Sequence, residues 1–173
     1  QLSNELHLPR FSIIDTPGAE LSQHAEENAM AGSIARTLGE LVDVDVPTVS
    51  IILGQGCGGG ALAMLPSDRV LAAENAWLSP LPPEGASAII YRDTSHAPRM
   101  MEEQRVSARA LVSAGIVDDI IPEKGDAAAE PEEFVRRTMF YIEHTIKELE
   151  TSPQRVGREQ RFQHYESLAK RLI

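Results

Sequence analysis

Five glycines fall within the seven residues from Gly54 to Gly60, and this cluster is the part of the sequence best suited to chemistry. The apolar run at 46–53 predicts a buried strand before it, and residues 61–65 predict the start of a helix after it. The first amides of a helix have no intrahelical partner and lie at the positive end of its dipole. Because glycine has no Cβ, a ligand can approach such amides closely. The cluster therefore predicts a strand-to-helix turn that stabilises an oxyanion.

The same glycines admit other interpretations. They can serve only to make a tight turn or to let two helices pack closely. The spacing of GQGCGG at 54–59 fits a dinucleotide-binding pattern, but Glu74 is the only acidic candidate about 20 residues later, and the Gly-Lys-Ser/Thr of a P-loop is absent. Cys57 is a candidate nucleophile without a recognisable base near it in the sequence. We therefore expect Cys57 to be structural and expect no dinucleotide site.

Composition and charge narrow the class of protein. The chain has 173 residues, of which 42% are hydrophobic and 24% are charged, as expected of one globular domain. Its net charge of −10 argues against nucleic acid as a partner. A single cysteine excludes a disulfide framework and fits the reducing cytoplasm, and no apolar run has the length of a membrane span. The first residues lack methionine, so we expect an internal piece of a longer chain.

Short strands and helices alternate around the glycine cluster. Apolar runs predict strands at 11–14, 46–53, 69–73, 76–79 and 116–121. Apolar periodicity and capping residues predict helices at 23–42, 87–91, 107–114, 131–150 and from a break at Pro153 to Leu172, besides the helix after the glycines. In the first of these helices we expect the stripe Met30, Ile34, Leu38 and Leu41 to be partly core and partly interface. This alternation is typical of an α/β domain.

The last segment differs from the rest in charge. Residues 153–173 hold five basic and two acidic residues, a net charge of +3, which leaves −13 for the remainder of the chain. Such a charge run is typical of a solvated helix face. The alternative is a docking arm that binds an acidic partner or the acidic body of the chain itself.

Several segments, taken together and in order, resemble the carboxyltransferase component of acetyl-CoA carboxylase and related acyl-CoA carboxylases, in the crotonase-like superfamily. The segments are FSIIDTPGAE at 11–20, SIARTL at 33–38, VPT at 46–48, GQGCGGGALAM at 54–64, the stretch 79–87 with Pro-Glu-Gly-Ala at 83–86, and SARALVSAGIVDDIIP at 107–122. Their order and spacing over residues 9–123 make the match more specific than any single motif. The chain is most similar to the alpha half, which receives carboxybiotin.

The resemblance implies a fold, partners and a cofactor. The fold is α/β, a crotonase/ClpP-like spiral of β-β-α units forming a partial domain, with residues 1–123 as the carboxyltransferase core and 124–173 as a C-terminal helical extension. The cofactor is biotin on a carrier protein, and no metal is expected in this chain. The implied partners are the acyl-CoA-binding beta half, the biotin carboxyl carrier protein and further copies in a cytoplasmic homo-oligomer.

The resemblance also implies the site residues. Gly59 and Gly60 would supply the amides that face the biotin carbonyl, and Gly56 and Gly58 would allow the approach. Pro83, Glu84, Gly85 and Ala86 correspond to a segment near the same pocket, where the amides of the last two would be further donors. A plain alternative for Glu84 is a first-turn carboxylate that complements a helix dipole.

The function implied is carboxyl transfer from carboxybiotin to acetyl-CoA or a similar short acyl-CoA, with backbone amides stabilising the biotin oxyanion. The requirement for preorganised N–H donors rather than a side-chain base agrees with the glycine turn. Two alternatives remain open: another crotonase-like acyl-CoA enzyme, such as a hydratase or decarboxylase, and a non-catalytic structural subunit of a carboxylase complex.

Overall fold

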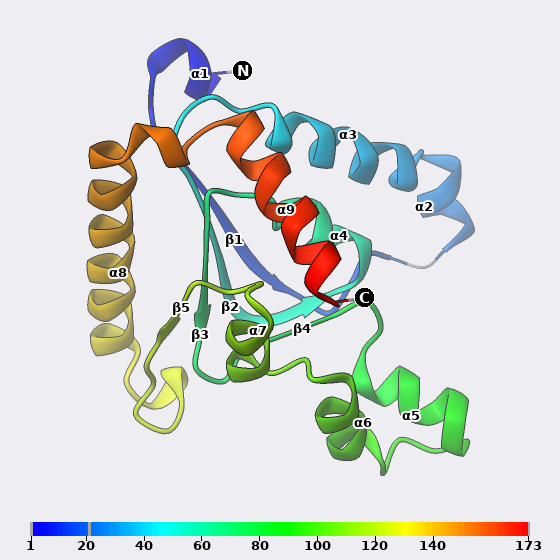
Figure 1. Cartoon of the computed structure of the whole chain (residues 1–173). Helices are drawn as coiled ribbons and strands as arrows, with labels where there is room; N and C mark the ends of the chain where they lie inside the picture. Colours follow the sequence, from blue (N-terminus) through cyan, green and yellow to red (C-terminus); the bar gives the residue numbers. More distant parts are fainter. Residues whose placement is uncertain (1, 21, 173) are drawn as a thin grey trace.

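A parallel sheet forms the centre of the molecule in the computed structural model, which describes residues 2–20 and 22–172 (Figure 1). The outer bounds expected for the two segments, residues 1 and 173, lie outside the described residues. The main strands, in spatial order, are β1 (Arg10–Thr16), β2 (Thr48–Cys57), β3 (Arg69–Ala73) and β5 (Asp119–Ile121). A further short strand outside this order, β4 (Trp77–Ser79), pairs with β2.

The long strand β2 has two partners on the same side. Its first part pairs with β3, from Val49 opposite Arg69 onwards, and its last part pairs with β4, which ends with Cys57 opposite Ser79. The chain therefore leaves β3, turns, and pairs with β2 again, further along that strand. This second pairing brings the loop after Ser79 to the place where the glycine turn begins.

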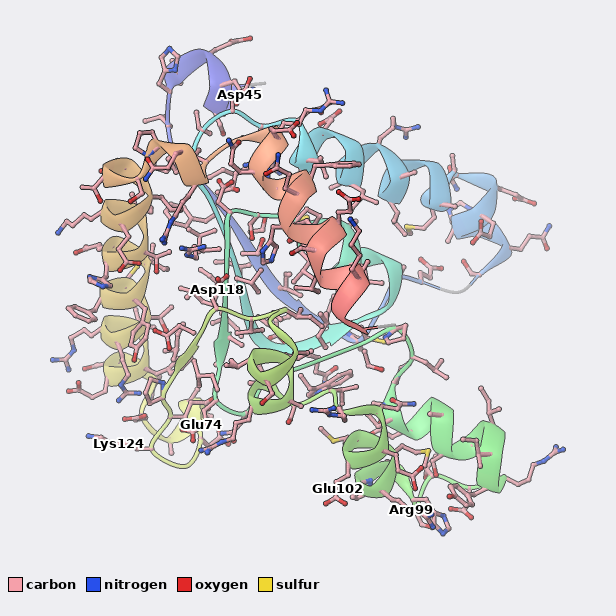
Figure 2. The ribbon with its side chains drawn as sticks, viewed as in Figure 1. Asp45, Glu74, Arg99, Glu102, Asp118 and Lys124 are labelled. Atoms are coloured by element: carbon pink, nitrogen blue, oxygen red, sulfur yellow. The ribbon has the colours of Figure 1, made fainter. Side chains whose placement is uncertain are left out.

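The turn between β3 and β4 is tied to the segment that follows β5. Glu74 accepts a hydrogen bond from Arg109 at 2.6 Å and from the backbone N–H of Glu123 at 3.1 Å. The bond from Glu123 N, and then that from Arg109, hold the pKa of Glu74 below its usual value. Glu74 lies near Lys124 at the end of the sheet away from Asp45 (Figure 2). The network fixes the point from which β4 returns to β2.

Different helices pack on the two faces of the sheet. Ser50 and Ile52 face α4 (Gly58–Met64), and Ser50 Oγ donates to Met64 O at 2.9 Å. The helices α3 (Met30–Val42) and α9 (Arg158–Leu172) lie on this side with α4 (Figure 1). Ile51 faces the other way, toward the long helix α8 (Pro131–Thr151). The core lies mainly between the sheet and these helices.

Shorter helical segments complete the described chain. The α-helices among them are α1 (Leu2–Leu6), α2 (Gln23–Glu27), α5 (Pro83–Tyr91), α6 (Ala97–Gln104) and α7 (Ala108–Ala114), and the 3-10 turns are η1 (Ala127–Ala129) and η2 (Pro153–Arg155). The helices α5 and α6 pack on each other and project from the body (Figure 1). No helix within residues 2–20 and 22–172 is both long and apolar enough to cross a membrane.

Most predicted elements are confirmed, but the single helix expected at 23–42 is wrong. The helix breaks at Ala29, which adopts a left-handed conformation with φ of 59°. The side chain of Asn28 donates to His24 O at 2.7 Å and so satisfies a carbonyl at the end of α2. Within the stripe on α3, Leu41 is buried and Leu38 is 41% exposed, so the stripe belongs only partly to the core.

The basic C-terminal segment docks on the chain's own acidic body. Arg161 is buried and contacts Asp68, with 2.7 Å between Nη1 and Oδ1. Arg158 pairs with Asp43 at 3.2 Å on the surface. The expectation of a merely solvated helix face is therefore wrong for α9, because its first turns bind the loops that surround the start of β2.

Candidate active site

The glycine cluster divides between the end of β2 and the start of α4. The strand continues through Gly54 and Gly56 to Cys57, and the helix begins at Gly58. The turn is therefore shorter than expected, and only Gly58, Gly59 and Gly60 belong to the helix. Gly58 has φ of +68°, a left-handed conformation that favours glycine.

The glycine at position 56 has a structural explanation in the contact between β2 and β4. A Cβ on Gly56 would lie 2.9 Å from both Leu78 Cδ1 and Trp77 O. The residue is buried in the pairing of β2 with β4. Glycine is required here because the neighbouring strand comes too close for any side chain.

The first amides of α4 are in the predicted place. The N–H groups of Gly59 and Gly60 precede the first i→i−4 bond of the helix, so α4 itself leaves them without acceptors. A Cβ on Gly60 would have no atom within 4 Å, whereas a Cβ on Gly59 would lie 3.3 Å from Ile34 Cδ1 on α3. The open space is therefore beside Gly60, and Gly59 is constrained by the packing of α3 on α4.

The segment at 83–86 forms the first turn of α5 rather than a loop before a helix. Pro83 takes the first helical position, which tolerates its missing N–H. Ala86 N donates to Pro82 O at 2.9 Å, so the prediction of a free donor at Ala86 is wrong. The N–H of Gly85 comes before that first bond of the helix. A Cβ on Gly85 would lie 3.5 Å from Leu81 Cδ1. Glu84 takes the first-turn position that complements the helix dipole.

A small cavity of about 240 Å³ lies beside the end of β2, and Pro83 and Glu84 are among its lining residues. Its other lining residues are Pro17, Gln55, Trp77, Pro82 and Met101. Gly59 and Gly60 are outside this lining. Cys57 at the end of β2 pairs with Ser79, and the proline loop begins directly after Ser79. This pairing therefore brings the start of α5, about 25 positions later in the sequence, next to the end of β2.

Cys57 has the properties of a structural thiol. Its side chain is 2% exposed. Burial, and secondarily the nearby Glu84 carboxylate, raises the pKa of the Cys57 thiol above its usual value. A raised pKa keeps the thiol protonated at neutral pH, and the thiol is the weak form of the nucleophile. The geometry therefore agrees with the structural role expected for this residue.

A larger cavity of about 540 Å³ has Ser79 and Pro80 in its lining. Apolar side chains dominate its lining, among them Leu62 of α4, Leu78, Val106 and Leu111. Sequence reasoning missed this cavity, because its walls come from α4, β4, the loop after α6 and α7. In the part of the chain that the structure describes, no cluster of three or more His, Cys, Asp or Glu side chains is placed to hold a metal ion.

Comparison with known families shows to which protein family the chain belongs. A family model described as acetyl co-enzyme A carboxylase carboxyltransferase-like matches residues 1–169. The chain belongs to this carboxyltransferase family. It is 51% identical over 164 residues to a probable biotin-dependent acyl-coenzyme A carboxylase beta3 subunit of Mycobacterium tuberculosis, covering 95% of the chain and 33% of that protein.

Alpha subunits of acetyl-coenzyme A carboxylase carboxyl transferase are also similar. The chain is 35% identical to that of Thermus thermophilus over 168 residues, which cover 96% of the chain and 54% of the relative. It is 34% identical to that of Rhizobium meliloti, covering 99% and 55%. The carboxyltransferase chain thus spans between a third and about half the length of these relatives.

Solved structures show the same fold. Transcarboxylase 12S, crystallised with hydrolysed methylmalonyl-coenzyme A, matches with a TM-score of 0.69 and 23% identity, over 86% of this chain and 29% of that one. The beta subunit of Pseudomonas aeruginosa geranyl-CoA carboxylase matches with a TM-score of 0.63 and 17% identity, over 86% and 30%. The crotonase-like fold class expected for the carboxyltransferase is confirmed, with the C-terminal helices packed on its parallel sheet.

Proposed function

We propose that this carboxyltransferase chain is the biotin-side half of an acyl-CoA carboxylase and transfers the carboxyl group of carboxybiotin to acetyl-CoA or a similar short acyl-CoA. The observation that carries the proposal is the first turn of α4. It presents the N–H groups of Gly59 and Gly60 without intrahelical acceptors, with open space where a side chain on Gly60 would stand.

These amides match the charge that develops in the reaction. When bound, carboxybiotin would supply the carboxyl group, and its ureido group would carry the resulting negative charge and take up the α-proton of the acyl-CoA. The N–H groups of Gly59 and Gly60 donate to the ureido oxygen and lie at the positive end of α4. Loss of one donor of this kind typically lowers the rate by about 10²–10³-fold. The protonated Cys57 thiol takes no part as a nucleophile.

The residues present fit a biotin ring. A Cβ on Gly60 would have no atom within 4 Å, so the backbone is open on that side, which supports the approach of a ligand there. The cavity lined by Pro83, Glu84 and Trp77 offers a mixed apolar and polar wall next to the end of β2. We assign Pro83, Glu84 and Gly85 to the biotin pocket, and Gly58 to the left-handed turn that gives access to it.

The rest of the catalytic assembly lies in other chains or other parts of a longer protein. The names of the relatives support biotin dependence and acyl-CoA substrates, and both acetyl-CoA and broader acyl-CoA carboxylases occur among them. The partners that we propose are an acyl-CoA-binding beta half, a biotin carboxyl carrier protein and a second copy of this chain. The half-exposed stripe on α3 supports association through that helix.

The test is an assay of the complete enzyme that contains this chain. We expect malonyl-CoA-dependent carboxylation of free biotin, and a comparison with methylmalonyl-CoA then identifies the preferred acyl group. A folded, complete assembly without this activity, or one that hydrates crotonyl-CoA instead, would refute the proposal. Sedimentation of the active enzyme as a species with one copy of this chain would refute the proposed homo-oligomer.

A further inference from the structure

Asp15 lies in a register shift between β1 and β2, just before the glycine turn. The two strands pair residue by residue up to Ile14 opposite Ile52, and the next pair is Thr16 opposite Gly56. The β2 strand therefore carries two more residues than β1 at this point. Such bulges bend a strand and change the direction in which the following residues point.

The side chain of Asp15 occupies this bulge. Its Oδ1 accepts a hydrogen bond from the backbone N–H of Gln55 at 3.0 Å. A Cβ on Gly54 would lie 2.8 Å from the same oxygen, closer than real Cβ atoms approach. The carboxylate can therefore reach Gln55 only because residue 54 is a glycine. This explains one glycine of the cluster by a contact inside the protein.

The turn that follows β1 contacts the start of α4. Gly18 N donates to Thr16 Oγ1 at 3.2 Å, which closes the turn after Asp15. The Cα of Gly18 lies 3.8 Å from the position of a Cβ on Gly58. The residues from Gln55 to Gly58 are thus held on one side by the carboxylate and on the other by this turn.

We propose that Asp15 is a positioning residue for carboxyl transfer: by binding the N–H of Gln55 it fixes the bulge of β2 and so aims the first amides of α4. The inference rests on the proposed function. Gln55 is three residues before Gly58, so a shift of its peptide moves the start of the helix. Misplacement of a catalytic donor by about 1 Å can lower the rate by about 10²-fold.

The position of Asp15 makes it suitable for mutation. The residue is exposed, so its truncation leaves no cavity in the core. Asp15→Asn keeps an oxygen that can accept from Gln55, whereas Asp15→Ala removes it. Gly54→Ala tests the same contact from the other side, because the new methyl group displaces the carboxylate. Asp45→Ala is the matched control, since Asp45 is an exposed aspartate in the loop before the other end of β2 (Figure 2).

The experiment measures biotin carboxylation by the complete enzyme for the four variants. We expect Asp15→Ala and Gly54→Ala to lower kcat about tenfold or more, equivalent to about 1.4 kcal/mol in the barrier, with little change in KM for the acyl-CoA. Asp15→Asn should stay within about threefold of the wild type, and Asp45→Ala should match it, as expected for isosteric and distant changes. A kcat for Asp15→Ala within about twofold of the wild type, the scatter of a neutral surface change, would overturn the inference, as would a large loss in Asp15→Asn.

A second measurement separates this inference from the proposed function. Hydrogen exchange of the backbone at 53–60 needs no carboxylase activity. We expect faster exchange in this segment for Asp15→Ala and Gly54→Ala, with the rest of the sheet unchanged and Asp15→Asn like the wild type. If the wild type fails to carboxylate biotin but the exchange pattern holds, the proposed reaction is wrong and the positioning of the turn stands. Unchanged exchange in Asp15→Ala would overturn the positioning role itself.

Discussion

Arg161 of α9 and Asp68, at the entrance to β3, form a fully buried ion pair. Their side chains are 1% and 0% exposed, and Nη1 lies 2.7 Å from Oδ1. The guanidinium also donates to the carbonyls of Val42 and Val44, and Thr48 donates to Asp68 Oδ2 at 2.8 Å. One side chain of the C-terminal helix thus joins the end of α3, the start of β2 and the start of β3.

We expect Arg161→Met to lower the free energy of unfolding by about 3–5 kcal/mol, because it leaves Asp68 as an uncompensated buried charge. Urea unfolding measures this change. The control is Arg158→Met, which removes the exposed pair with Asp43 and should cost about 1 kcal/mol or less. Equal effects of the two variants would show that the buried pair contributes no more than a surface pair.

Gly59 and Gly60, which we propose as donors to the substrate, should respond differently to added side chains. Gly60→Ala should fold and keep measurable turnover, since its methyl group meets no atom within 4 Å. Gly59→Val should abolish biotin carboxylation and leave acyl-CoA affinity nearly unchanged, because the new side chain pushes on Ile34 and shifts the first turn of α4. Biotin carboxylation and acyl-CoA affinity are measured on both variants.

A paired variant checks the reason for the Gly59 effect. Ile34→Ala removes both atoms that a Cβ on Gly59 would approach, at 3.3 and 3.6 Å. Gly59→Ala combined with Ile34→Ala should therefore regain activity relative to Gly59→Ala alone. If it does not, the methyl group obstructs the substrate directly. Loss of acyl-CoA binding with retained biotin carboxylation in Gly59→Val would mean that the turn serves the other substrate.

Cys57 should be replaceable. Cys57→Ala should retain most of the carboxylation activity, since the thiol is buried, protonated and outside the proposed chemistry. Its cost should appear in thermal unfolding, because the methyl group fills less of the core than the thiol does. A loss of kcat beyond about 10³-fold in a folded enzyme, the scale of a lost catalytic group, would restore the nucleophile interpretation.

Glu130 gives the fold a defined dependence on pH. Hydrogen bonds from Arg137, and then from Lys124 N, lower the pKa of Glu130 from 4.5 to about 2. Since the folded pKa is below the unfolded one, the stability from this group is complete above about pH 4.5 and is lost as the pH falls toward 2. Glu130→Gln should lower the melting temperature at pH 7 and flatten its decline between pH 4.5 and about 2.

The control for this pH profile is Glu133→Gln. Glu133 pairs with Arg136 at 2.6 Å, but both side chains are more than half exposed. Its removal should leave the profile close to that of the wild type, as exposed pairs contribute little. A profile of Glu130→Gln that follows the wild type in the acid range would mean that Arg137 does not hold this carboxylate in solution.

Sequence patterns predicted the elements better than the contacts between them. The apolar runs located β1, β2 and β3 because each strand contains a run of mainly apolar residues next to turn residues. The break at Ala29 was missed because alanine is a good helix former and carries no sign of a left-handed conformation. The role of Gly54 was missed because it depends on Asp15, a residue 39 positions earlier that meets it only across the sheet.

The same contrast between local patterns and contacts between elements applies to the candidate site. The strand-to-helix turn was predicted from local sequence, because the glycines stand between an apolar run and a helix start, whereas Gly59 and Gly60 were assigned to it from the family resemblance. Gln55, Trp77 and Met101 were not found, because their approach depends on the second pairing of β2, with β4. That pairing is set by a return of the chain through Glu74, which no local periodicity encodes.

The buried contact between α9 and the sheet also has a consequence for synthesis on the ribosome. Asp68 and Arg161 are 93 residues apart. At a translation rate of about 5–20 residues per second, Asp68 is synthesised on the order of 5 to 20 s before Arg161. During that interval the strands β1 to β3 exist without the cation that neutralises their loop, and Asp68 keeps its hydration shell. Closure of the molecule around this charge therefore follows the synthesis of β3 by at least that interval.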